Sequence, residues 1–202
     1  MRTLLGVDSL SAASDAELLA TAGSQPEAFG ELFARHGQAV YAYCARRTGD
    51  LDRAEDLTSV VFLEAFRRRR KLRLSSNSAV PLLLGVANNV VRNSSRSVRR
   101  YRSALGRIPD PALSISAEDE AIERLDAQEA LALAREAISA LSRAEQDVIL
   151  LVWWSELSYA DAATALGVPI GTVRSRLARA RAKLSHSAPA TNLINPSAQE
   201  ML

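Results

Sequence analysis

The stretch 157–184, "LSYADAATALGVPIGTVRSRLARARAKL", decides how the C-terminal part of the chain folds. An alanine-rich segment stops at Gly167, and a segment with five basic residues and no acidic one follows Pro169. Ser158 is a helix N-cap followed three residues later by an acid, Gly167 supplies a left-handed C-cap, and Pro169 suits the first turn of a new helix. The stretch therefore predicts a helix over 159–166, a tight turn and a second helix, which together form a helix-turn-helix.

The two faces of this second helix differ in chemistry. At 100° per residue one side is apolar and must pack inward. That side consists of Val173, Leu177, Ala180 and Leu184. The other side is hydroxylic and basic, as expected of a helix in the major groove of DNA, where arginine reads guanine and neighbouring residues hold phosphates. The candidate DNA contacts are Thr172, Arg174, Ser175, Arg176, Arg179 and Lys183. A basic surface helix in an ordinary bundle is the alternative.

Composition favours an all-α chain without catalytic or metal-dependent chemistry. Ala, Leu, Arg and Glu dominate and aromatic residues make up 5% of the 202 residues, which argues against a large sandwich or barrel. The single Cys44 and two histidines offer neither an internal disulfide nor a zinc-ligand cluster. No nucleophile–base pair or glycine-rich phosphate loop occurs, so we expect no enzyme, cofactor or metal. Without a signal peptide or an apolar run of about 18 residues, the expected location is the cytoplasm.

Charge is unevenly distributed along the chain. Residues 67–107 hold 12 basic and no acidic side chains, whereas residues 108–147 hold 3 basic and 10 acidic ones. A second basic block follows over 148–185. Two basic blocks separated by an acidic one indicate two contacts with a polyanion, joined by a segment that avoids it. Ordinary solvated helix faces are the alternative.

Hydrophobic periodicity divides the chain into two helical domains. The segments predicted are an N-terminal domain over 15–107, an acidic flexible linker over 108–128, a C-terminal domain over 129–185 and a disordered tail over 186–202. In the first domain, Gly49-Asp50 separates two helices. On either side of this break, apolar residues fall at helical spacings. They are Phe29, Leu32, Phe33, Val40 and Cys44, then the stripe Ala54, Leu57, Val61 and Ala65. In the second domain, Trp153, Trp154 and Tyr159 are expected to pack in the core.

Three segments resemble one family of proteins. The region ending in "GTVRSRLARAR", residues 171–181, resembles the promoter-binding C-terminal region of bacterial sigma factors, in particular the extracytoplasmic function group. "AEDLTSVVFLEAF", residues 54–66, resembles the helix by which these proteins grip a coiled coil of core RNA polymerase. "VPLLLGVANNVVRN", residues 80–93, resembles the segment that reads the downstream promoter hexamer. The resemblance covers roughly 160 residues in the family's order.

The resemblance implies roles for further residues. The candidates for the polymerase interface, some for contact and some for packing, are Asp56, Leu57, Phe62 and Glu64. In the downstream-reading segment, amides could bond base edges and arginines hold phosphates, although helix capping explains the amides equally well. These candidates are Asn88, Asn89, Arg92, Asn93, Arg96, Arg99 and Arg100. Ser59-Val60 replaces a common Gln-Glu pair, and Leu82 replaces a usual Trp.

The implied function is that of an alternative sigma factor, which binds core RNA polymerase and directs promoter-specific transcription initiation. The C-terminal domain would bind the minus thirty-five element of promoter DNA and the N-terminal domain the minus ten element. An anti-sigma factor is the usual further partner in this family, and no membrane insertion is expected. A free-standing helix-turn-helix regulator that forms no polymerase holoenzyme is the alternative.

Overall fold

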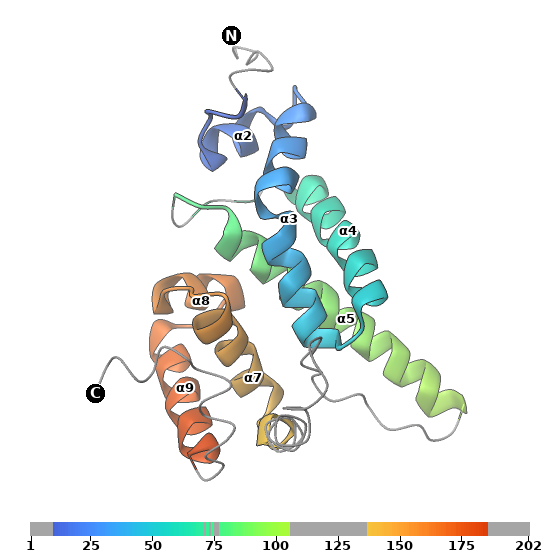
Figure 1. Cartoon of the computed structure of the whole chain (residues 1–202), viewed down its shortest axis with the longest axis vertical. Helices are drawn as coiled ribbons and strands as arrows, with labels where there is room; N and C mark the ends of the chain where they lie inside the picture. Colours follow the sequence, from blue (N-terminus) through green and yellow to red (C-terminus); the bar gives the residue numbers. More distant parts are fainter. Residues whose placement is uncertain (1–9, 71, 73, 75–76, 106–136, 186–202) are drawn as a thin grey trace, which may run out of the picture.

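The structure, a computed structural model, describes residues 10–70, 72, 74, 77–105 and 137–185, with the backbone alone over 96–105 (Figure 1). The described residues form helices, turns and loops without a strand, so the prediction of an all-α chain is confirmed. The predicted linker and tail lie outside the described residues. The helices in chain order are α2 (Asp15–Thr21), α3 (Glu27–Thr48), α4 (Leu51–Arg68), α5 (Val80–Leu105), α7 (Arg143–Ile149), the π-helical segment η1 (Leu150–Trp154), α8 (Tyr159–Leu166) and α9 (Ile170–Leu184).

Local capping residues set the helix boundaries of the N-terminal part. The hydroxyl of Ser14 accepts a hydrogen bond from the N–H of Glu17, and the carboxylate of Glu17 accepts one from the N–H of Ser14. Helix α2 therefore begins with a capping box. Gly49 ends α3 with φ of 68°, a left-handed conformation that suits glycine. Asp50 then caps α4 through the N–H of Arg53. The predicted break at Gly49-Asp50 is confirmed.

The core of the N-terminal part forms where α3, α4 and α5 pack together. All four residues of the predicted α4 stripe are buried, as are Phe29, Leu32, Val40 and Cys44 of α3. Phe33 is the exception, because 48% of this residue is exposed. Its ring meets that of Phe62 edge-on at 4.7 Å between centroids, at the margin of the core. Phe33 therefore follows the apolar spacing of α3 without entering the core.

The helix-turn-helix forms as the sequence predicts. Ser158 caps α8 through the N–H of Asp161, and Gly167 ends this helix with φ of 63°. Pro169 stands at the N-cap of α9, one residue before the predicted first turn. The four residues on the predicted apolar side of α9 are all buried. Trp153, Trp154 and Tyr159 are half-buried against the core, and the two tryptophans lie in the π-helical segment rather than in a continuous α-helix.

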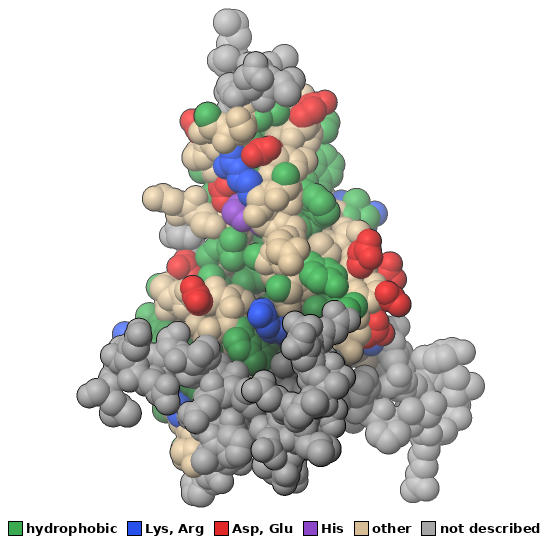
Figure 2. Space-filling model, in the orientation of Figure 1, with side chains coloured by type: hydrophobic (Ala, Val, Ile, Leu, Met, Phe, Trp, Pro, Cys, Tyr) green, Lys and Arg blue, Asp and Glu red, His purple; other side chains and the backbone are tan. Residues whose placement is uncertain are grey.

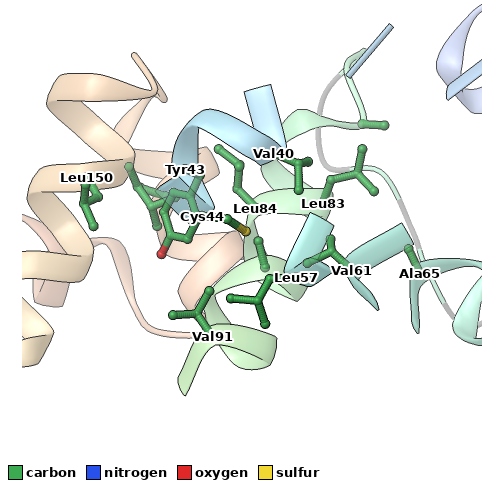
Figure 3. Packing of buried hydrophobic residues seen from close by; sticks show 14 of the residues in the cluster. Val40, Tyr43, Cys44, Leu57, Val61, Ala65, Leu83, Leu84, Val91 and Leu150 are labelled. Atoms are coloured by element: carbon green, nitrogen blue, oxygen red, sulfur yellow. The ribbon is translucent and has the colours of Figure 1, made fainter. Parts of the chain in front are cut away.

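The N- and C-terminal parts pack directly against each other, a contact that the sequence did not predict. Helix α8 lies against α5, and the buried residues of both parts form one hydrophobic cluster. Figure 3 shows Tyr43 of α3 with Leu150 of η1 on one side and Cys44 and Leu84 on the other. Gly85 of α5 allows the close approach to α8, because a Cβ there would lie 2.7 Å from the carbonyl oxygen of Ala165.

Candidate nucleic-acid and polymerase interfaces

The solvent-facing side of α9 carries the predicted DNA contacts. Arg174, Ser175, Arg179 and Lys183 are exposed, while Thr172 and Arg176 are half-buried. The Ser175 hydroxyl donates to the carbonyl of Thr172 at 3.1 Å, and Arg179 Nε donates to the carbonyl of Ser175 at 3.3 Å. These weak bonds within one helix leave both side chains on the surface. The predicted orientation of the helix is confirmed, and contact of these residues with DNA stays a prediction.

Lys183 of this face forms an ion pair with an acidic residue of α7. Its Nζ donates to Oε2 of Glu145 at 2.8 Å, across the space between α9 and α7. Burial alone would raise the pKa of Glu145, but the bonds from Lys183 and Ser142 outweigh it and lower the pKa. Glu145 therefore stays ionised at neutral pH and keeps hold of the ammonium group. A phosphate contact by Lys183 would compete with this ion pair.

The predicted downstream-reading residues of α5 do not share one environment. Asn88 is 2% exposed, and its Oδ1 accepts a bond from the hydroxyl of Tyr43 at 3.2 Å. Because this amide joins α5 to α3 in the interior, the prediction that Asn88 reads a base is wrong for this arrangement. Asn89, Arg92 and Asn93 are exposed on the same helix. Side chains of Arg96, Arg99 and Arg100 lie outside the described residues.

The four candidates on α4 divide into surface and core residues. Asp56 is exposed and Glu64 half-buried, the latter paired with Arg67 at 3.2 Å and Arg68 at 3.0 Å. Leu57 and Phe62 are buried, so their role is packing. Figure 2 shows acidic side chains gathered over α4 beside a hydrophobic area, and Asp52, Glu55 and Asp56 are the exposed acids of this helix.

An apolar surface at α3 and α4 was missed by the sequence analysis. Phe33, Val60 and Leu63 are 48%, 43% and 48% exposed, unusual for side chains of this size. Val60 and Leu63 follow Asp56 at intervals of four and three residues, so all three share the outer face of α4. This spacing is the sequence signal from which the exposed face could have been predicted, because these residues form a second stripe along α4, opposite the buried one.

A buried ion pair joins the N- and C-terminal parts. Arg47 of α3 donates to Asp147 of α7 at 2.6 Å and to Oε1 of Gln146 at 2.9 Å, and the side chains of Arg47 and Asp147 are only 7% and 4% exposed. Arg92, a predicted phosphate contact, lies 3.9 Å from the same carboxylate. Burial raises the pKa of Asp147, and the guanidinium of Arg47 offsets this only in part. A predicted DNA contact of α5 thus faces an acid of the C-terminal part.

The described part of the chain offers no reactive thiol, metal-binding cluster or membrane-spanning helix. Cys44 is buried, and burial raises the pKa of its thiol to about 11, which leaves it a poor nucleophile. Among the described residues no group of three or more histidine, cysteine, aspartate or glutamate side chains is placed to hold a metal ion. None of the described helices is both long and apolar enough to cross a membrane.

An exposed basic helix behind a helix-turn-helix turn, with a second basic helix in the same chain, is typical of the class of DNA-binding transcription proteins. The chain matches the family described as Sigma-70 region 2 over residues 32–101 and the one described as Sigma-70, region 4 over residues 131–184. It is 33% identical over 154 residues to RNA polymerase sigma factor HrpL of Pseudomonas syringae pv. syringae, covering 76% of this chain and 83% of the relative. The chain belongs to the sigma-70 family of RNA polymerase sigma factors.

Further relatives place it in the extracytoplasmic function (ECF) group. ECF RNA polymerase sigma factor SigC of Mycobacterium tuberculosis is 36% identical over 133 residues, covering 65% of this chain and 68% of the relative. CnrH, solved in complex with the cytosolic domain of CnrY, has a TM-score of 0.61 and 27% identity over 88% of this chain and 99% of that one. RpoE of Bartonella quintana, solved with the anti-sigma factor NepR, has a TM-score of 0.61 over 79% of this chain and 96% of that one. At 24% identity, the RpoE likeness concerns the fold.

Proposed function

We propose that this sigma factor divides its work between its two parts. The N-terminal part, residues 15–107, binds core RNA polymerase through the outer face of α4 and the minus ten element through the exposed face of α5. The C-terminal part, residues 129–185, binds the minus thirty-five element through α9. The chain supplies no catalytic group of its own, because the polymerase performs the chemistry, and it acts in the cytoplasm. An anti-sigma factor is a further candidate partner, because it is the usual one in the family that the sequence resembles.

The observation that carries this proposal is the exposed basic face of α9 behind a correctly formed turn. Four of the six predicted DNA contacts face solvent there, while the four residues of the predicted apolar side of the same helix are buried. A recognition helix needs this division, because one face must fix it to its domain while the other enters the groove. Ser175 and Arg179, one turn apart, would reach deepest, with Arg176 and Lys183 toward the phosphates.

The test compares Arg179→Ala with Lys183→Ala on every single-base variant of the upstream hexamer, using transcription by core polymerase as the readout. A bidentate arginine–guanine contact is worth roughly 1–3 kcal/mol of discrimination, so Arg179→Ala should lower activity about tenfold and relax preference at one base pair. Lys183→Ala should weaken all variants alike. If Arg179→Ala lowers transcription equally from all promoter variants, Arg179 is a phosphate contact and the helix is rotated in the groove relative to this proposal.

Co-purification separates this proposal from a free-standing regulator. A sigma factor should be retained with core polymerase in the absence of DNA, whereas a free regulator should bind promoter DNA tightly without polymerase. Two basic surfaces on one chain should give the isolated protein weak, strongly salt-dependent DNA binding. Tight, sequence-specific binding by the isolated chain in physiological salt would favour the regulator.

A further inference from the structure

The carboxylate of Asp15 lies within hydrogen-bond distance of three partners, two on α3 and one at the residue before α5. Asp15 is the first residue of α2 and is only 6% exposed. Its Oδ2 accepts the backbone N–H of Ala79 at 2.7 Å and lies 2.7 Å from Nε2 of His36, and its Oδ1 accepts from Arg35 at 3.3 Å. Ala79 immediately precedes α5, so one side chain links the start of α2, the middle of α3 and the start of α5.

Arg35 holds the segment before α2 in place. Besides Asp15, its guanidinium donates to the carbonyls of Leu10 at 3.0 Å, Ser11 at 2.8 Å and Ala13 at 2.7 Å. The position of Asp15 is therefore fixed through α3, independently of its bond to Ala79. The bond from the Ala79 N–H to Asp15 then fixes the start of α5 relative to α2 and α3.

The charge state of Asp15 suits this task. Burial alone would raise the pKa of its carboxyl group, but the bonds from Ala79, His36 and Arg35 outweigh burial and lower the pKa. An ionised carboxylate at the start of a helix is favourable, because the helix dipole leaves positive charge there. A charge-assisted bond to a backbone N–H is about twice as strong as a neutral one.

The connection between α4 and α5 lies beside this anchor. A groove of about 670 Å³ is lined by α2 on one side and by the end of α4 and the following residues on the other. Its lining includes Ala16, Leu19, Arg69, Arg70, Leu72 and Leu74. Since Ala16 adjoins Asp15, the anchor and the groove share the same turn of α2. Asp15 thus fixes the junction from which the basic helix α5 departs.

We propose that Asp15 is a positioning residue for reading the downstream promoter element: it fixes the start of α5, and with it the direction in which this helix presents Asn89, Arg92 and Asn93. This inference rests on the proposed function of α5. It goes beyond the family match, because Asp15 lies outside residues 32–101.

The test measures base preference rather than activity alone. Transcription by core polymerase with Asp15→Asn is measured on all single-base variants of the downstream and upstream hexamers. Asparagine offers a neutral oxygen and an extra donor to a site that already holds three donors, so the anchor is weakened. Preference in the downstream hexamer should flatten by about fivefold, and preference in the upstream hexamer should not change. If the variant only reduces the amount of folded protein, transcription from every promoter variant falls by the same factor. A merely structural effect therefore leaves the ratios between promoter variants unchanged.

Two further variants sharpen the result. Ala79→Pro removes the donor while leaving Asp15, Arg35 and His36 in place, and it should flatten the same preferences. Glu27→Gln, which changes an exposed acid in the first turn of α3, is the matched control and should behave as the unaltered protein. Unchanged ratios in both Asp15→Asn and Ala79→Pro would overturn the proposal.

A measurement on the isolated protein keeps this inference separate from the proposed function. Hydrogen exchange at the Ala79 amide should be about fivefold faster in Asp15→Asn than in Glu27→Gln. Equal exchange rates would show that Asp15 does not hold α5, whatever the promoter assays give. If the unaltered protein directs no promoter-dependent transcription, the proposed function fails, and the exchange rates still decide whether the anchor exists.

Discussion

Gly85→Ala should separate the two parts of the chain while strengthening the helix that carries the change. Gly85 is buried in α5, and an added Cβ would lie 2.7 Å from the carbonyl oxygen and 3.1 Å from the Cα of Ala165 in α8. Both are backbone atoms, which cannot rotate away as a side chain would. The overlap is therefore relieved only if α8 moves away from α5.

The size of the effect follows from two opposing terms. Within a helix, alanine is more favourable than glycine by about 1 kcal/mol, so α5 itself gains stability. Overpacking a close contact costs about 1–3 kcal/mol, and here that cost falls on the contact between the two parts. Since about 1.4 kcal/mol is a factor of ten, the ratio of separated to packed molecules should rise between about fivefold and about a hundredfold.

The assay is the distance between spin labels on exposed cysteines introduced at Ser59 of α4 and Thr164 of α8, both exposed. Cys44 can stay, because it is buried and its raised pKa leaves little thiolate to react. Gly30→Ala in α3 is the matched control, since nothing lies within 4 Å of its added Cβ. Gly85→Ala should add a longer, broader distance population that Gly30→Ala lacks. Identical distance distributions for the two variants would show that the close approach at Gly85 does not control packing of the two parts.

Three further outcomes follow from the interfaces. Arg47→Met leaves the Asp147 carboxylate buried without its closest partner, so the free energy of packing between the two parts should weaken by about 3–5 kcal/mol. The same spin-label distances measure this loss, and a loss no larger than that in Asp147→Asn would contradict the prediction. Because burial raises the pKa of Asp147 above its ordinary value of 3.8, the packed form binds the proton more tightly, so packing should strengthen as the pH falls from neutral toward that ordinary value. An equal gain in Asp147→Asn would assign the effect to other groups. Leu63→Asp should lower affinity for core polymerase about tenfold with little change in thermal stability, and unchanged affinity in a competition assay would remove the outer face of α4 from the polymerase interface.

Local signals in the sequence predicted most of the fold. Gly49, Asp50, Ser158 and Gly167 act through their own backbone or their nearest neighbours, so their effects could be predicted without knowledge of tertiary packing. The helical period likewise predicted the buried stripe of α9, because a helix that packs on one side needs only that pattern.

The features that the sequence did not predict depend on contacts between distant residues. Asn88 follows the polar pattern of its neighbours, yet Tyr43, 45 residues earlier, binds it in the interior. Phe33 fits the apolar period of α3 but lies at the margin of the core, where its ring contacts that of Phe62 edge-on. The Arg47–Asp147 pair joins residues 100 positions apart, and no local pattern marks either as a partner. Such pairings need the three-dimensional arrangement of helices.

The most direct test of sigma-factor function is run-off transcription by core RNA polymerase over a promoter library, with and without the purified chain. A sigma factor should give transcripts that start at a defined position downstream of paired upstream and downstream elements, and that appear only when the chain is added. Transcripts that are identical with and without the chain would contradict it, as would a chain that binds promoter DNA but never associates with core polymerase.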